Sequence, residues 1–420
     1  MKYSYANLLG TFRLKYTKVL CLKSIFIFLI SSCGYSNSPQ HDENKPVVLQ
    51  DQIDRLAQVS VGAEQTVDYL PLLRDKKIGI VGNQSSLIGQ THLVDSLLSL
   101  GLNVVKVFSP EHGFRGDADA GEHVSSKKDQ KTGLPIVSLY GKNKKPTQEQ
   151  LRGLEIVVFD IQDVGVRFYT YISTLHYVME ACAEANIPLI VLDRPNPNGH
   201  YVDGPVLDPK FKSFVGMHPV PIVYGMTIGE YGKMINGEKW LEKNLSCDLR
   251  VIPCKNYDHD TPYSLPVPPS PNLRSDVSIQ LYPSLCILEA TTVTVGRGTD
   301  GPFERYGHPD FPKMEFEFTP KSGVGSKNPK YKGVKCYGYN LNDSIHKRAT
   351  QFDLSFLLNA NELLKGKTFV DRTRMFNLLS GNDILIKQLK VGKTEKEIRD
   401  TWKADLDAFQ LVRAKYLVYE

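Results

Sequence analysis

The stretch LRGLEIVVFDIQD, residues 151–163, decides the fold that we expect for this chain. Its apolar centre is short and almost continuous, and it ends abruptly in acidic and amide side chains. Three other segments have the same form: KKIGIVGNQSS (76–86), NVVKVFSPEHG (103–113) and IPLIVLDRPNP (187–197). Continuous apolar strands are typical of a parallel sheet that is covered on both faces.

Segments with helical spacing alternate with these strands, for example HLVDSLLSLG (92–101) and STLHYVMEACAEANI (173–187). This alternation predicts an α/β fold built on a Rossmann-like, doubly wound parallel sheet. In such sheets ligands bind beyond the carboxyl ends of the strands. We therefore expect the functional site among the polar clusters that follow the strands, at residues 83–85, 109–112, 160–163 and 193–196.

The character of the sequence changes near residue 210, and 420 residues are enough for two domains. Beyond that point come a short strand, DLRVIPC (248–254), a proline-dense stretch and a loop rich in glycine and threonine. We predict a Rossmann-like catalytic domain over 61–210 and a smaller C-terminal α/β domain over 211–420. The active-site cleft is expected between them.

The N-terminus has the composition of a targeting segment. Residues 1–32 contain basic but no acidic side chains, and without them the chain has 46 of each. A neutral remainder argues against a nucleic-acid partner. The apolar run IFIFLI (25–30), followed by two serines and Cys33, resembles a lipoprotein signal. The alternative is a misassigned start or a buried strand.

From this pattern we expect a signal peptide over 1–32, lipidation of Cys33 and a polar tether over 33–60. The protein would then be anchored by lipid to a membrane of the cell envelope, on its periplasmic face or at the cell surface. No other segment has the roughly 18 apolar residues that a membrane-spanning helix needs.

Other motifs that resemble cofactor-binding or metal-binding sequences lack the required spacing or the required neighbouring elements. We therefore expect no metal and no cofactor. Gly296–Gly301 matches G-x-G-x-x-G, but Pro302 follows and no helix begins there. The cysteines have no C-x-x-C spacing, and for Cys247 and Cys254 a disulfide and two buried thiols are both open. Side chains of a loop could collect a divalent cation, but solvated loop charge is the preferred interpretation: Glu111, His112, Asp117, Asp119, Glu122 and His123.

Carboxylates at the strand ends remain as the chemical groups. Glu111 follows one strand, and Asp160 and Asp163 end the most apolar one. Two carboxylates in a partly dry cleft, one protonated and one ionised, are what glycoside hydrolysis requires. The aromatic residues around Tyr169 could stack a sugar beside Arg167, or they could form core. Asp160 could equally cap a helix or pair with Arg167.

At these residues a family resemblance appears. SPEHGFRG, AGEHV, FDIQDVGVRFYTYISTL, VLDRPNPNG, PPSPNL and VGRGTDGPFERYG resemble, in order, the domain of unknown function 1343. That family includes exo-β-N-acetylmuramidases, glycoside hydrolase family 171. The resemblance implies the two-domain fold with its cleft. It also implies release of terminal, non-reducing N-acetylmuramic acid from peptidoglycan-derived muropeptides or disaccharides.

Residue by residue, the resemblance implies that Glu111 is the general acid/base and Asp160 its partner, with Asp163 second. Arginines would recognise the lactyl carboxylate of the sugar, because a guanidinium binds carboxylates in two-point contacts. The chain has Glu289-Ala-Thr-Thr where the family often has Glu-Gly-Thr-Asn. Positions that match motifs around the cleft are Asn83, His112, Arg167, Tyr169, Arg194, Asn196, Asn272, Glu289, Arg297 and Thr299.

Two other functions fit the same residues. One is a lipid-anchored protein that captures muropeptides without cleaving them. The other is a metal-assisted hydrolase of a different cell-wall bond. Retention or inversion at the anomeric carbon and the oligomeric state are left open by the sequence.

Overall fold

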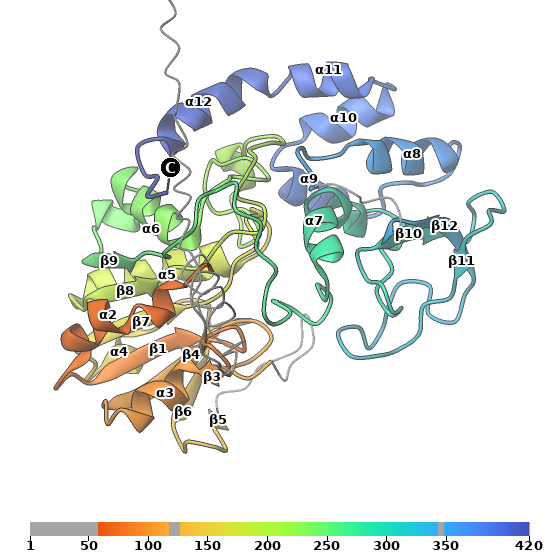
Figure 1. The fold of residues 1–420 in the computed structure, drawn as a ribbon. Helices are drawn as coiled ribbons and strands as arrows, with labels where there is room; N and C mark the ends of the chain where they lie inside the picture. The colour runs from red at the N-terminus through yellow and green to blue at the C-terminus, as the bar shows by residue number, and fades with distance from the viewer. Residues whose placement is uncertain (1–57, 117–126, 343–347, 420) are drawn as a thin grey trace, which may run out of the picture. The chain divides into compact units, whose positions relative to one another are not determined.

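The large sheet of this computed structural model has the expected Rossmann-like topology (Figure 1). The structure describes residues 58–116, 127–342 and 348–419. Six parallel strands and one antiparallel edge strand, β5, form the sheet. Counted along the chain, the parallel strands stand in the order 3-2-1-4-5-6, which is that of dinucleotide-binding folds. Across the sheet the strands are β5 (Lys127–Lys128), β6 (Pro135–Ser138), β4 (Val104–Ser109), β1 (Ile78–Gly82), β7 (Ile156–Asp160), β8 (Leu189–Leu192) and β9 (Leu249–Ile252).

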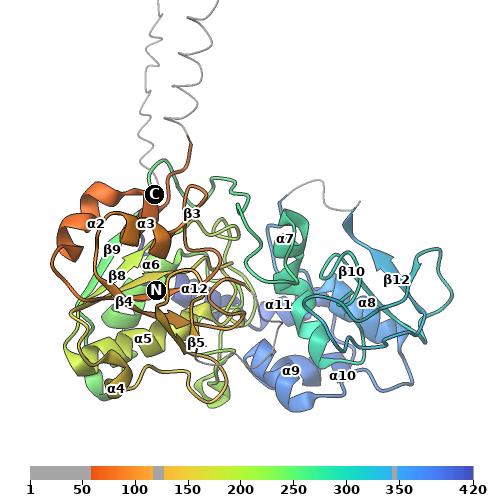
Figure 2. The ribbon, with the colours of Figure 1, turned by 90° about the horizontal axis from the view of Figure 1, so that it is seen from below.

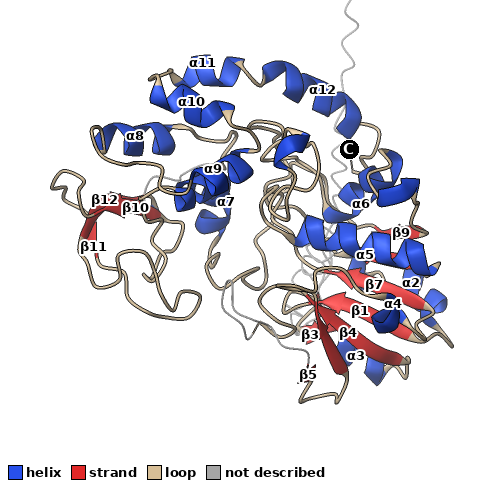
Figure 3. Ribbon diagram, turned by 180° about the vertical axis from the view of Figure 1, so that it is seen from behind, coloured by secondary structure: helices blue, strands red, loops and turns tan. Residues whose placement is uncertain are grey.

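Helices cover both faces of this sheet, as Figure 3 shows. On one face α2 (Thr66–Leu73) and α3 (Leu93–Ser99) pack on a core that includes Ile78 and Ile80 of β1. On the other face α5 (Tyr171–Ala185) and α6 (Ile228–Gly237) pack on a core that includes Val81. Neighbouring residues of a strand point to opposite faces, so a strand needs an unbroken apolar run to serve both cores. The predicted fold class is confirmed.

The boundary predicted at residue 210 falls too early in the chain. β9 lies well beyond it and pairs with β8, and α6 packs against both α5 and β9. The segment DLRVIPC therefore completes the large sheet. Its short strand has too little apolar character to reveal its partner from sequence. We call residues 58–275 the sheet domain and 276–419 the C-terminal domain.

The C-terminal domain contains a small antiparallel sheet and a series of helices. The sheet has the order β10-β12-β11, with β10 (Arg305–His308), β11 (Glu317–Phe318) and β12 (Cys336–Asn340). Its core is continuous with that of the α5 face of the large sheet. The helices are α7 (Asp276–Leu285), α8 (Ser355–Leu363), α9 (Thr373–Ser380), α10 (Ile384–Lys390), α11 (Glu395–Asp400) and α12 (Lys403–Arg413).

The end of the chain returns to the sheet domain. Figures 1 and 2 show α11 and α12 running back toward α6. The Tyr419 hydroxyl donates to Asp193 Oδ2 at 2.6 Å, and the Val418 amide donates to Glu230 Oε1 at 2.7 Å. Both acceptors are buried carboxylates of the sheet domain. The two domains are thus joined at the terminal segment as well as by the chain between them.

Two further observations bear on the sequence predictions. Cys182, Cys247, Cys254, Cys286 and Cys336 are all free and buried, so the thiol alternative holds for Cys247 and Cys254. None of the helices in the described ranges is long and apolar enough to cross a bilayer. The predicted signal, Cys33 and the tether as far as residue 57 lie outside the described residues.

A fully buried guanidinium connects the two domains. Arg167 Nη1 donates to the carbonyls of Pro205 and Val220 at 2.7 and 2.8 Å, and Nη2 donates to the Leu379 carbonyl of α9 at 2.8 Å. In the described structure every acceptor of this side chain is a backbone carbonyl, and burial lowers the pKa of Arg167 to about 9. Gly381 packs directly against this guanidinium, because a Cβ at position 381 would lie only 2.6 Å from Arg167 Nη2.

We expect Gly381→Ala to be much more destabilising than Gly392→Ala. Both glycines have positive φ, 82° and 70°, which costs another residue about 1–2 kcal/mol. A Cβ at Gly392 meets nothing within 4 Å, whereas one at Gly381 collides with the buried cation. Crowding of this kind adds about 1–3 kcal/mol. Urea denaturation of the two variants measures the difference. Equal losses of stability would mean that the Arg167 contact is not tight.

Candidate active site

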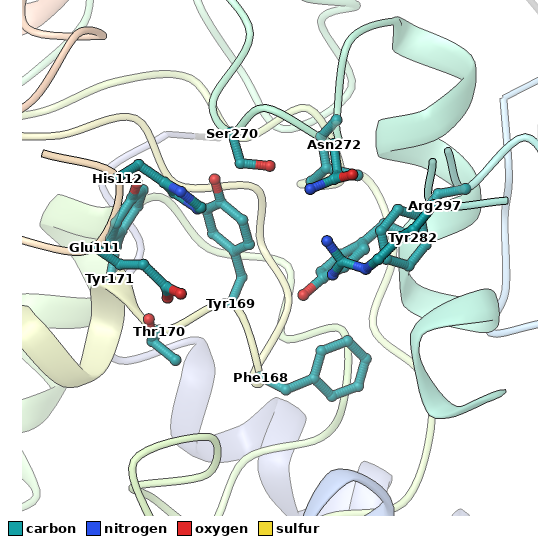
Figure 4. Close-up of a pocket in the computed structure, with 12 residues that line it drawn as sticks. Glu111, His112, Phe168, Tyr169, Thr170, Tyr171, Ser270, Asn272, Tyr282 and Arg297 are labelled. Atoms are coloured by element: carbon teal, nitrogen blue, oxygen red, sulfur yellow. The ribbon is translucent and has the colours of Figure 1, made fainter. Parts of the chain in front are cut away.

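A pocket lies where the carboxyl end of the large sheet faces the C-terminal domain. Its empty space is about 480 Å³, including the part open to solvent. Figure 4 shows side chains of both domains around it. The sheet domain contributes Glu111, His112, Phe168, Tyr169, Thr170, Tyr171, Ser270, Asn272 and Leu273, and the C-terminal domain contributes Tyr282, Arg297 and Phe303.

The loop after β4 carries Glu111, which lines the pocket. The position of this loop is fixed by contacts of the residues that follow Glu111. The Phe114 ring is buried and meets the His92 ring edge-on, with centroids 4.7 Å apart. Arg115 Nε donates to Asp129 at 2.9 Å, and Arg115 Nη2 donates to Asp95 at 3.0 Å. An arginine shared by two carboxylates restrains the backbone, so the loop presents Glu111 in a fixed direction.

Glu111 is the one carboxylate among the described residues that line the pocket. It is half-buried, and Figure 4 shows its carboxylate directed into the space beside Thr170. The Tyr140 hydroxyl is hydrogen-bonded to Glu111, and burial together with this carboxylate raises the pKa of Tyr140. Burial and the field of Glu111 also raise the pKa of Tyr171. Both phenols therefore remain neutral donors beside the carboxylate.

The wall beside Glu111 is made of two tyrosines. The rings of Tyr169 and Tyr171 meet edge-on with centroids 4.9 Å apart. Tyr169 donates to the Pro269 carbonyl at 2.8 Å, and the Tyr171 hydroxyl accepts from Asn83 Nδ2 at 2.9 Å. Tyr169 thus lines the pocket, as predicted. Asn83 is fully buried behind the wall and orients Tyr171 without lining the pocket itself.

The opposite wall carries Arg297. Its Nε and Nη2 donate to the two carboxylate oxygens of Glu289 at 2.5 and 3.0 Å, and its guanidinium lies 4.9 Å from the centre of the Phe303 ring. This pairing leaves Nη1 for another acceptor. Asn272 lines the same wall and donates to the Gly325 carbonyl at 2.7 Å. Thr299 accepts from the Gly301 amide and supports the loop rather than the pocket surface.

Asp160 and Arg194 form a buried ion pair with each other. Arg194 Nε and Nη2 donate to the Asp160 carboxylate at 2.6 and 2.9 Å, and Nη2 also donates to the Leu87 carbonyl. Neither residue is among those that line the pocket of Glu111. The pairing of Asp160 with an arginine was one of the sequence alternatives, but the partner is Arg194 and not Arg167.

Asp163 and Asn196 also lie behind the pocket surface. Asp163 accepts from the Tyr224 hydroxyl and from the Gly165 amide, and burial raises its pKa to about 7. Its Oδ1 is buried without a hydrogen-bond partner in the described structure. Asn196 donates to the Met226 carbonyl at 2.8 Å and accepts from the Asn198 amide. These contacts shape the loops that follow β7 and β8.

Sequence reasoning missed several lining residues. Thr170, Ser270 and Phe303 each lie within a quoted motif, and that position was the signal available to find them; Tyr282 of α7 lies in none of the motifs quoted above. Within the described ranges no group of three or more His, Cys, Asp or Glu side chains is placed to hold a metal ion. Asp117, Asp119, Glu122 and His123 of the loop considered for a metal lie outside those ranges.

We expect Asp160→Asn to lower the stability of the fold by about 3–5 kcal/mol, since it leaves the buried Arg194 without its counter-charge. Chemical denaturation at pH 7 measures the loss. Asp383→Asn is the matched control, because Asp383 pairs with Lys387 on an exposed helix surface and should matter little. An Asp160→Asn protein of normal stability and abolished turnover would instead give Asp160 a direct part in the reaction.

Comparisons with known proteins cover nearly all of the described chain. Models for the N-terminal and C-terminal parts of exo-β-N-acetylmuramidase NamZ match residues 78–277 and 280–419. A Bacillus subtilis (strain 168) protein named peptidoglycan β-N-acetylmuramidase NamZ is 37% identical over 427 residues, covering 94% of this chain and 100% of that protein.

Two crystal structures of DUF1343 family proteins from Bacteroides fragilis NCTC 9343 are also similar. One has a TM-score of 0.79 at 46% identity and covers 86% of this chain and 99% of its own. The other has a TM-score of 0.73 at 28% identity and covers 87% and 100%. The chain therefore belongs to the exo-β-N-acetylmuramidase NamZ family.

Proposed function

We propose that the protein is an exo-acting glycosidase that releases terminal, non-reducing N-acetylmuramic acid from peptidoglycan fragments. The observation that carries this function is the pocket itself. It sets the carboxylate of Glu111 opposite the guanidinium of Arg297, with aromatic walls between them, in a chain of the NamZ family. A carboxyl group can transfer the proton to the leaving group, and a guanidinium can bind the carboxylate of an acidic sugar.

Glu111 acts as the general acid that protonates the leaving-group oxygen. It is partly buried and its position is fixed by the anchored loop, so a sugar bound against Tyr169 meets it in a constant geometry. Asp160 is neutralised by Arg194, and we assign it a structural role. Asp163 remains the proposed partner. Burial, the neighbouring tyrosines and the charge of Asp163 together raise the pKa of Tyr169, which lines the pocket in front of Asp163.

Of the three arginines considered for the lactyl carboxylate, Arg297 is the one that lines the pocket. Arg167 is fully buried and donates from both terminal nitrogens to backbone carbonyls, and Arg194 is paired with Asp160. Arg297 retains Nη1 for a ligand. An arginine held by Glu289 is pre-organised, so less side-chain entropy is lost when the substrate binds.

The test is product release from a natural N-acetylmuramyl disaccharide, followed by mass spectrometry. Wild-type protein should release N-acetylmuramic acid, and Glu111→Gln should lower turnover by about 10²–10⁴-fold. On a nitrophenyl N-acetylmuramide the loss should be much smaller, because nitrophenolate leaves with little protonation.

Each result decides between functions. Tight binding of the disaccharide by the wild type without release would indicate a muropeptide-binding protein. Release that a chelator abolishes would indicate a metal-assisted hydrolase. Near-normal turnover of Glu111→Gln on the disaccharide would move the acid role elsewhere, with His112 as the next residue to replace.

We further propose that the protein is anchored by lipid to a membrane of the cell envelope, at its periplasmic face or at the cell surface. Support comes from the sequence alone: a basic, acid-free segment, the apolar run before two serines, and Cys33. Peptidoglycan fragments are present in that compartment. The anchor would hold the enzyme near its substrate.

Cys33→Ala should leave an unprocessed precursor or release the protein in soluble form. Membrane fractionation and immunoblotting measure both outcomes, and Cys21→Ala is the matched control within the same segment. Unchanged processing and an unchanged membrane fraction for Cys33→Ala would remove lipidation from the proposal.

A further inference from the structure

A second pocket lies inside the C-terminal domain, next to the first. Its empty space is about 700 Å³, including the part open to solvent, and it shares Arg297 with the pocket of Glu111. Its polar lining includes Thr294, Ser326 and Asn328, and its charged lining includes Glu289 and Lys330. The Arg297 side chain is therefore part of the lining of both pockets.

Lys330 is a cation with an unused donor. Its Nζ donates to the carbonyls of Thr291 and Val293, the latter at 3.0 Å. An ammonium group has three donors, so one remains after these two bonds. Within the described chain no carboxylate pairs directly with this amine. A partly buried cation whose bonds are all to neutral groups is costly unless an anion is bound, so it indicates a ligand.

The surroundings of Lys330 add to the positive field. Arg297 and Arg372 also line the pocket, against Glu289 and the exposed Asp371. Glu289 is already engaged by Arg297 in a two-point contact. Although its burial acts in the opposite sense, these cations hold the pKa of Glu289 below its usual value. The helix α9 begins at Thr373, so the positive end of its dipole lies at the same wall.

We propose that this second pocket is a carboxylate-binding subsite of the active site, in which Lys330 and Arg297 together hold the lactyl carboxylate of the terminal sugar. The proposal rests on the proposed function and extends it. N-acetylmuramic acid differs from N-acetylglucosamine by a short ether arm that carries a carboxylate. With the sugar ring in the first pocket, that arm would extend toward Arg297, which also lines the pocket of Lys330.

The loop that carries Lys330 is connected to the first pocket. Asn272 lines the first pocket and donates to the Gly325 carbonyl, and Ser326 and residues 328–330 line the second. One hydrogen bond therefore joins the loop of Lys330 to the wall of the first pocket. Lys330 would decide specificity between the two amino sugars, while Glu111 performs the proton transfer on either.

The test compares two chromogenic substrates, an N-acetylmuramide with a free lactyl carboxylate and its lactyl methylamide. Lys330→Met should lower kcat/KM for the acid by about 10- to 100-fold, the value of a hydrogen bond to a charged group, and leave the slower amide unchanged. Lys330→Arg should restore much of the loss. Lys332→Met is the matched control, since Lys332 is exposed on the same loop. Equal losses on both substrates, or no loss on the acid, would overturn the proposal.

A pH profile adds a readout that a structural role would not change. Burial lowers the pKa of Lys330 to about 8; the charges that face it are Asp371, Arg372, Glu289 and Arg297. Above that pH the amine loses its proton and its attraction for the carboxylate. The ratio of kcat/KM for acid over amide should therefore fall above about pH 8 in the wild type and stay level in Lys330→Arg. A level ratio through pH 9 in the wild type would count against the subsite.

Failure of the subsite and failure of the enzymatic function are distinguishable. If the wild type cleaves neither substrate, calorimetry with free N-acetylmuramic acid tests the subsite alone. Binding to the wild type and Lys332→Met, but not to Lys330→Met, would support it without catalysis. Equal binding to all three would overturn it.

Discussion

The buried guanidinium of Arg167 is the constraint on which the geometry of the active site depends. It is bound by carbonyls from two loops of the sheet domain and from α9 of the C-terminal domain. Leu379 is in the last turn of α9, where carbonyls lack helical partners and the helix dipole is negative, so the helix end replaces a counter-ion. The next residues in the chain, 168–171, form the floor and wall of the pocket. The contact that joins the domains thus also positions residues that line the pocket.

Charged side chains are divided between those that stabilise the fold and those that face a ligand. Asp160 and Arg194 neutralise each other completely inside the sheet domain. Glu111, Arg297 and Lys330 instead line the pocket of Glu111 and the second pocket, and neither Asp160 nor Arg194 lines either of these two. Desolvation explains the division, because a fully buried charge must have all its partners within the protein. A charge at a pocket can leave one position open for substrate.

Much of the fold could be predicted from the sequence, because continuous apolar runs and their polar ends are local signals. The loop of Glu111 and the tyrosine wall were found in this way. Which polar residue at a strand end faces the pocket could not be predicted, because neighbouring side chains point in opposite directions. Asp160 and Arg194 end adjacent strands, and their pairing follows only once β7 and β8 are known to be neighbours. Lys330 was missed because it lies in an irregular loop, and its unused donor becomes evident only from the carbonyls around it.

The helix α9 connects the surroundings of the two pockets. Its C-terminus binds Arg167 behind the first pocket, and its N-terminus borders the second pocket. A rigid element of eight residues therefore connects the floor of the pocket that holds Glu111 with the wall that carries the excess positive charge. Each domain supplies one half of the recognition, the acid from the sheet domain and the cations from the C-terminal domain. If the sugar and its carboxylate bind as proposed, both can be held only while α9 keeps these halves in position, and specificity for an acidic sugar then follows from the interface between the domains.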